Sequence, residues 1–175
     1  MHSCRRLSGS HIRTSSRCTA SVAFGCLLVR VGAPCGYGAT MFPRHDGLRV
    51  MEFGTRGAMR DRLVALVLHG NKRATAGLLT DYEAESEVIE HVGERLAMVD
   101  NDGQHVGTLL VTRVEIVRFA DVPDEFALAE AEGDLDASDF RASHQAYWAS
   151  VGNAVDDDTL VVTLYFDLVP VDSGP

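Results

Sequence analysis

Cysteine is absent from most of this 175-residue chain, because all four cysteines lie between positions 4 and 35. Their spacings contain no CxxC pair, which argues against a zinc site, and residues 36–175 cannot form a disulfide. Long apolar runs are also missing. Arg30 ends the mostly apolar stretch 20–29, and a membrane-spanning helix needs roughly 20 such residues. These absences favour a cytoplasmic protein that does not enter a membrane.

Acidic residues are missing from residues 1–45, which contain six arginines, whereas residues 46–175 contain ten basic and 25 acidic side chains. A start rich in arginine and serine is typical of a transit peptide, and the short apolar stretch also fits a secretory signal. Met41 and Met51 would both serve as alternative starts. We therefore expect a disordered or non-native extension over residues 1–45, with a targeting segment as the alternative, and a domain over residues 46–172.

Lysine is almost absent, since Lys72 is the only one in the chain. A lysine can lose its proton when it is desolvated, whereas arginine effectively cannot. Thr75 follows three positions later, and residues three apart in a strand face opposite sides. The two side chains can meet only if Lys72 lies in a turn or at a helix end that leads into the strand, where a lysine could activate the threonine hydroxyl. The alternatives are a lysine retained by chance and a threonine present for its strand propensity.

Familiar catalytic and cofactor motifs are missing as well. There is no Walker loop, GxGxxG, HExxH or GxSxG pattern. His69, His91 and His105 show no metal-ligand spacing with His144. The sequence therefore predicts neither a metal site nor a cofactor.

Hydrophobic periodicity predicts a helix over residues 57–69 that stops at Gly70, then a short apolar stretch to residue 79. Residues 81–92 are acidic and irregular. Strands are expected over 94–99 and 105–118, joined by a turn at 101–103, and over 160–169. Helices are expected over 123–132, ended by Gly133, and over 137–150, capped by Asp136. Because strands and helices do not alternate regularly, the order indicates an α+β fold.

Two further groups of side chains could carry chemistry. Glu130, Glu132 and Asp134 form an acidic cluster, and a carboxylic acid paired with Lys72 could transfer protons. His144 lies on a helical stripe with Phe140 and Trp148, where it could reach a ligand or stack on a base. A solvated helix end and a histidine at the edge of the core are the alternatives.

Taken in order, these motifs resemble the ASCH domain family of the PUA-like superfamily, over about residues 50–169, and most closely its stand-alone bacterial type. The resemblance implies a small open β-barrel with flanking helices. The matching residues are Gly70, Lys72, Thr75, Tyr82, Glu83, Glu125, Phe126, Ala127, Glu130, Glu132, Gly133, Asp134, Phe140 and His144.

The family resemblance implies that RNA or a nucleoside-like ligand binds in a cleft lined by the GxKxxT motif. Some members are amidohydrolases that act on N4-acetylcytidine, and another is a ribonuclease. Their pattern places a catalytic set at Lys72, Thr75 and Glu132, and the remaining candidates for ligand binding are Gly70, Arg73, Tyr82, Glu83, Asp134 and His144. Those amidohydrolases are shorter and differ at Arg73 and Ala74, so the choice between binding and hydrolysis stays open.

The charge of the domain bears on this choice. Residues 46–175 carry a net charge of −15, whereas binding of a long polyanion needs a basic footprint. A small modified nucleoside or another amide suits such a body better than extended RNA, and a regulatory interaction domain is a third option. The sequence does not determine the oligomeric state. A local basic cluster near the first helix is the available footprint for RNA: Arg56, Arg60, Arg62, Lys72 and Arg73.

Overall fold

A computed structural model describes residues 43–169, so most of the predicted N-terminal extension lies outside the described residues. Six strands form one mixed sheet in the order β1-β2-β4-β5-β6-β3. Neighbouring strands are antiparallel except for β2 and β4, which are parallel. The strands are β1 (Arg44–His45), β2 (Leu48–Met51), β3 (Ala74–Leu78), β4 (Arg95–Val99), β5 (His105–Arg118) and β6 (Leu160–Val169).

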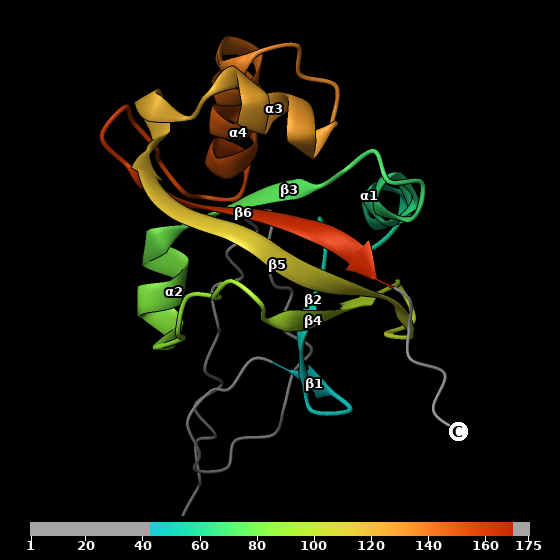
Figure 1. Cartoon of the computed structure of the whole chain (residues 1–175). Helices are drawn as coiled ribbons and strands as arrows, with labels where there is room; N and C mark the ends of the chain where they lie inside the picture. The colour runs from blue at the N-terminus through green and yellow to red at the C-terminus, as the bar shows by residue number, and fades with distance from the viewer. Residues whose placement is uncertain (1–42, 170–175) are drawn as a thin grey trace, which may run out of the picture.

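Four helices flank this sheet: α1 (Ala58–Leu68), α2 (Leu79–Glu85), α3 (Asp124–Glu130) and α4 (Ala137–Ser150). Figure 1 shows α3 and α4 together above β3, whereas α2 lies on the other side of the long, curved strands β5 and β6. The predicted α+β class is therefore confirmed. The sheet ends at β1 and β3 and does not close, so the predicted open barrel is supported only in a loose sense. None of the helices within residues 43–169 is long and apolar enough to cross a membrane.

Two apolar clusters lie on opposite faces of the sheet. The first cluster packs α1 and α2 against one face of β4, β5 and β6, and Phe53 and Leu63 are fully buried in it. The second cluster packs α3 and α4 against β3. Alternation along β3 places Ala74 and Ala76 in the second cluster, so Thr75 between them faces the first. Strand β3 is therefore buried on both faces, and Lys72, two residues before it, is buried as well.

Several predicted elements are confirmed closely. The strand bounds 105–118 and 160–169 match β5 and β6, and β4 pairs with β5 as the expected hairpin. Asp136 caps α4, because its carboxylate accepts hydrogen bonds from the backbone amides of Ser138 and Asp139. These features depend on local patterns of propensity and capping, which the sequence displays directly.

Other elements depart from the prediction. Helix α2 occupies part of the segment expected to be irregular, and it buries only Tyr82, so it carries no apolar stripe. The short strands β1 and β2 were not predicted. Helix α3 ends at Glu130 rather than near Gly133, because Ala131 adopts a left-handed conformation with φ of 54°. Because the helix ends there, Glu132 lies outside α3, and its side chain contacts Lys72.

Candidate functional site

A buried group of charged side chains lies between the end of α3, the turn before β3 and α4. Lys72 Nζ lies 2.6 Å from Glu132 Oε1 and 3.6 Å from Glu130 Oε1. His144 Nε2 faces Glu130 Oε2 at 3.3 Å. Lys72 is 1% exposed, Glu130 0% and His144 5%. Glu132 is partly exposed, with 13% of its side chain accessible. We call these four residues, Lys72, Glu130, Glu132 and His144, the buried charge cluster.

The left-handed residue Ala131 makes this cluster possible. In a continuous helix, residues two apart point in nearly opposite directions, because each residue turns the chain by about 100°. Glu130 is the last residue of α3, and the reversal of φ at Ala131 redirects the chain before Glu132. Both carboxylates therefore reach the same ammonium group of Lys72.

The GxKxxT segment positions the lysine. Gly70 has φ of +76°, a value that suits glycine at the end of α1, and the amide of Lys72 donates to the carbonyl of Leu66. The amide of Arg73 donates to the carbonyl of Ala129, and the carbonyl of Arg73 accepts from the amide of Phe166. These backbone bonds join the segment to α3 and β6, so Lys72 lies beside the end of α3.

The charges of the cluster perturb its titrating groups. Burial by itself raises the pKa of the Glu130 carboxyl, but the positive charge of Lys72 and the contact with His144 outweigh burial and lower that pKa below its ordinary value. Burial lowers the pKa of the His144 imidazole, but its contact with Glu130 and the charge of Glu132 raise it above its ordinary value. Each group thus stabilises the charged form of the other.

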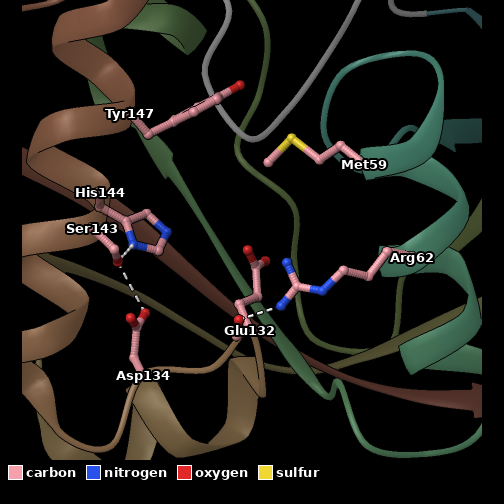
Figure 2. Close-up of a pocket in the computed structure, with 7 residues that line it drawn as sticks. All are labelled: Met59, Arg62, Glu132, Asp134, Ser143, His144 and Tyr147. Carbon is pink, nitrogen blue, oxygen red and sulfur yellow. Dashed lines mark hydrogen bonds between the residues drawn. The ribbon is translucent and has the colours of Figure 1, made fainter.

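A pocket of about 200 Å³ opens beside the cluster. Figure 2 shows that α1 supplies one wall and α4 the other, with Glu132 between them. The guanidinium of Arg62 donates to the backbone carbonyl of Glu132, and the hydroxyl of Ser143 donates to Asp134 Oδ2 at 3.1 Å. The residues that line this pocket are Met59, Arg62, Glu132, Asp134, Ser143, His144 and Tyr147.

The structure brings together most of the predicted acidic cluster, the lysine and His144. Lys72 does lie in a turn before β3, as the proposed meeting with Thr75 requires. The Thr75 side chain is fully buried, however, and its hydroxyl has no hydrogen-bond partner within residues 43–169. The geometry therefore joins Lys72 to Glu132 directly but does not show a hydrogen bond from Lys72 to Thr75.

Four predicted ligand-binding residues do not line this pocket. Tyr82 is buried on α2, where its hydroxyl donates to Glu90 Oε2 at 3.0 Å, and Glu83 is exposed on the same helix. Arg73 is exposed and lines a separate hollow of about 340 Å³ beside Tyr165. Gly70 acts through its backbone conformation.

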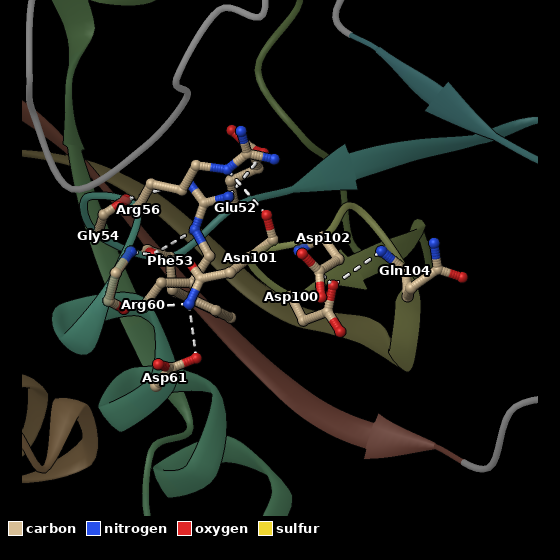
Figure 3. Close-up of polar contacts among 11 residues, drawn as sticks. Glu52, Phe53, Gly54, Arg56, Arg60, Asp61, Asp100, Asn101, Asp102 and Gln104 are labelled. Carbon is tan, nitrogen blue, oxygen red and sulfur yellow. Dashed lines mark hydrogen bonds and ion pairs between the residues drawn. The ribbon is translucent and has the colours of Figure 1, made fainter.

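The predicted basic cluster is exposed only in part, because Arg56, Arg62 and Arg73 are exposed whereas the other two residues are buried. Arg60 is buried and pairs with Glu52 at 2.9 Å, and Lys72 belongs to the buried charge cluster. Arg56 donates to the carbonyl of Asn101, whose side chain also binds Gly57 and Asp61 and so ties the start of α1 to the turn between β4 and β5 (Figure 3). Arg60 and Lys72 are therefore withdrawn from the surface, and Arg56 helps to hold the start of α1 in place.

Three of the lining residues, Met59, Ser143 and Tyr147, were not predicted as site residues, and Arg62 was expected only as part of a basic footprint for RNA. A signal for two of them was present, because Ser143 and Tyr147 flank His144 on the same side of α4. Met59 and Arg62 share one side of α1, but nothing local indicates that α1 faces α4. Within residues 43–169, no group of three or more histidine, cysteine or acidic side chains has the arrangement of a metal site.

A family model described as the ASCH domain matches residues 49–170 of this chain. The crystal structure of an ASCH domain from Lactobacillus crispatus JV V101 is similar, with a TM-score of 0.55 and 25% sequence identity over 62% of this chain and 71% of that one. A protein from Enterococcus faecalis V583 is also similar, with a TM-score of 0.55 and 29% identity over 63% and 69% of the two chains. A comparison with curated proteins found no match.

Proposed function

Because this chain belongs to the ASCH domain family, a PUA-like family linked to RNA binding, we propose that the pocket between α1 and α4 binds a nucleoside-like ligand. The observation that carries the proposal is the set of groups that meet there. Carboxylates of Glu132 and Asp134 accept hydrogen bonds, Arg62 donates them, and the ring of Tyr147 offers an aromatic face. A base needs this combination, because proteins read unpaired bases by stacking and by hydrogen bonds to their edges.

The charge of the site favours a small ligand over a long strand. Two carboxylates line the pocket, and two of the five residues of the expected basic cluster are buried in ion pairs. Affinity for extended RNA depends on cations that neutralise phosphates. A single nucleoside, or one base presented by a short RNA, makes no such demand.

Binding of the full chain to N4-acetylcytidine, cytidine and a short single-stranded RNA tests this proposal by isothermal titration calorimetry. We expect at least one nucleoside to bind, and we expect Tyr147→Ala to weaken that binding by removing the aromatic face. Replacement of an exposed arginine outside the pocket, Arg73→Gln, is the matched control. Binding of RNA alone that Arg73→Gln abolishes and Tyr147→Ala spares would place the ligand elsewhere.

A second candidate function is hydrolysis of N4-acetylcytidine or a related small amide. The contact of 2.6 Å between Lys72 Nζ and Glu132 Oε1 supports it, because the Lys72 ammonium can pass a proton to this carboxylate and the neutral amine can then remove the proton of a nucleophile. In this scheme the Thr75 hydroxyl attacks the amide carbonyl, cytidine leaves with a proton, and water then releases acetate. The buried Thr75 side chain would have to become accessible for this attack.

Chromatography of N4-acetylcytidine after incubation with the full chain distinguishes hydrolysis from binding. Release of cytidine and acetate that Lys72→Ala and Thr75→Val both abolish would support the catalytic set. Cleavage of the short RNA in a parallel reaction would instead indicate a ribonuclease. Binding without either product would leave the binding module as the function.

A further inference from the structure

The two ring nitrogens of His144 both face hydrogen-bond acceptors. Nδ1 lies 3.1 Å from the carbonyl oxygen of Phe140, which can only accept, and 3.3 Å from the hydroxyl oxygen of Ser143. That hydroxyl has one proton and directs it to Asp134 Oδ2 or to the same Phe140 carbonyl, each at 3.1 Å, so toward Nδ1 it also acts as an acceptor. Nε2 lies 3.3 Å from a carboxylate oxygen of Glu130. A neutral imidazole carries one N–H and can satisfy only one of these contacts, whereas an imidazolium satisfies both. The ring is also fixed in orientation, because it stacks on Phe140 with 3.9 Å between the ring centroids.

The balance of charge leads to the same conclusion. The buried charge cluster contains two carboxylates and one ammonium group, so it is neutral only if His144 carries the fourth charge. Buried charges are costly unless they are paired. The charged groups around the His144 ring come from every neighbouring element: Glu130 at the end of α3, Glu132 and Asp134 from the segment after it, Lys72 from the turn before β3, and Arg62 from α1.

Loss of the His144 proton would change which carboxylate Lys72 contacts. Glu130 would then have Lys72 as its only nearby cation within the cluster, and the ammonium group would be drawn toward it and away from Glu132. Glu132 lines the pocket, so a weaker hold on its carboxylate alters the surface that the ligand meets. The proton on His144 and the shape of the pocket are thus connected through Glu130 and Lys72.

We propose that Glu130 holds His144 as an imidazolium, and that these two residues position Lys72 on Glu132 so that the ligand binds more tightly while His144 is charged. This inference rests on the proposed function for its second half, whereas the charge state of His144 can be measured without any ligand. His144 and Glu130 are positioning residues in this scheme. The raised pKa of the imidazole and the lowered pKa of the carboxyl agree with the geometry.

The first experiment is an NMR titration of the histidine ring nitrogens in the ligand-free full chain, with His144→Gln to assign the signals. We expect both nitrogens of His144 to have imidazolium shifts at pH 7 and to titrate above the ordinary value of 6.5. Glu130→Gln should return the titration toward or below that value. A neutral ring at pH 7 in the unmodified chain would overturn the proposal and leave the proposed function unaffected.

The second experiment measures the dissociation constant of N4-acetylcytidine and of cytidine between pH 6 and 9. We expect affinity in the unmodified chain to fall by about fivefold or more as His144 loses its proton, which is a typical coupling between two linked sites. Glu130→Gln should flatten this profile, because Lys72 and Glu132 then balance without an imidazolium. His91→Gln, which changes an exposed histidine paired with Glu94, should keep the profile of the unmodified chain.

The outcomes separate the positioning role of Glu130 and His144 from the proposed binding of a nucleoside. Binding that is independent of pH, or a Glu130→Gln profile equal to that of the unmodified chain, would overturn the positioning role although a ligand binds. Absence of binding by either nucleoside at every pH would overturn the proposed function and the ligand half of this inference together. In that case an imidazolium signal would still confirm the buried charge pair of Glu130 and His144.

Discussion

Replacement of Lys72 by methionine is the sharpest test of the buried charge cluster. Lys72 is 1% exposed and its ammonium group contacts two carboxylates, so Lys72→Met leaves both carboxylates without their shared cation. Two unit charges about 4 Å apart interact by about 4 kcal/mol at the effective dielectric of a protein site. Breaking a buried ion pair from one side typically costs about 3–5 kcal/mol. We therefore expect the free energy of unfolding to fall by about 3–5 kcal/mol, a large share of the roughly 5–15 kcal/mol of an ordinary domain.

Urea unfolding followed by fluorescence measures this loss. Trp148 is the only tryptophan in the chain and is fully buried, so its emission reports the folded state. The neighbouring exposed cation provides the matched control, since Arg73→Met should change stability by no more than about 0.5 kcal/mol. The double variant Lys72→Met/Glu130→Gln removes one charge of each sign and should recover part of the loss.

A small loss of unfolding free energy in Lys72→Met would contradict the pairing of Lys72 with two carboxylates. A loss below about 1 kcal/mol for Lys72→Met is the value of a solvent-exposed ion pair. Such a result would mean that water or neighbouring groups compensate both carboxylates, and the charge balance that we assign to the cluster would be wrong. Equal losses for Lys72→Met and for the double variant would show that Glu130 does not depend on the lysine.

Three further predictions follow from the same structure. The free energy of unfolding should decrease as pH rises from about 6.5 through the raised pKa of His144, because the contacts of His144 stabilise the folded state only while the imidazole is protonated. His144→Gln should remove this pH dependence in urea titrations, and a pH dependence that persists would contradict the assignment. Asp136→Ala should cost about 1 kcal/mol in thermal unfolding through loss of the helix cap, whereas Asp136→Asn should cost little. Phe140→Ala should cost about 3–5 kcal/mol by leaving a cavity beneath His144, and an intact melting temperature would exclude that packing.

Much of the fold was predictable because its signals are local. The run of β-branched residues marked β5, the NDG turn marked the hairpin, and Asp136 marked the start of α4. Helix α2 was not predicted because it lacks such a local signal. Tyr82 is its only buried residue, so the sequence shows no apolar stripe at helical spacing. The parallel strand β2 was missed because four residues carry too little pattern to identify a strand without its neighbour.

The candidate site was predictable in composition but not in geometry. The family resemblance selected Lys72, Glu132, Asp134 and His144, and the structure brings these side chains to one region. The same resemblance selected Tyr82, which packs beneath α2 beside Glu90 instead of reaching the pocket. A motif reports which residue types occur in which order, whereas the direction of each side chain depends on the packing of the element that carries it.

The sequence by itself determined most of the strand and helix pattern, though not α2, β1 and β2, together with the family resemblance and the position of the single lysine, Lys72. Only the tertiary structure decided that the Glu130 and Glu132 carboxylates converge on Lys72. The left-handed residue between them is an alanine, so no glycine in the sequence indicates the turn. It also decided that Arg60 is buried against Glu52 rather than exposed as a basic footprint. Local propensity is encoded within a few neighbouring residues, but the pairing of charges depends on groups that folding brings together from distant positions, and burial then makes that pairing obligatory.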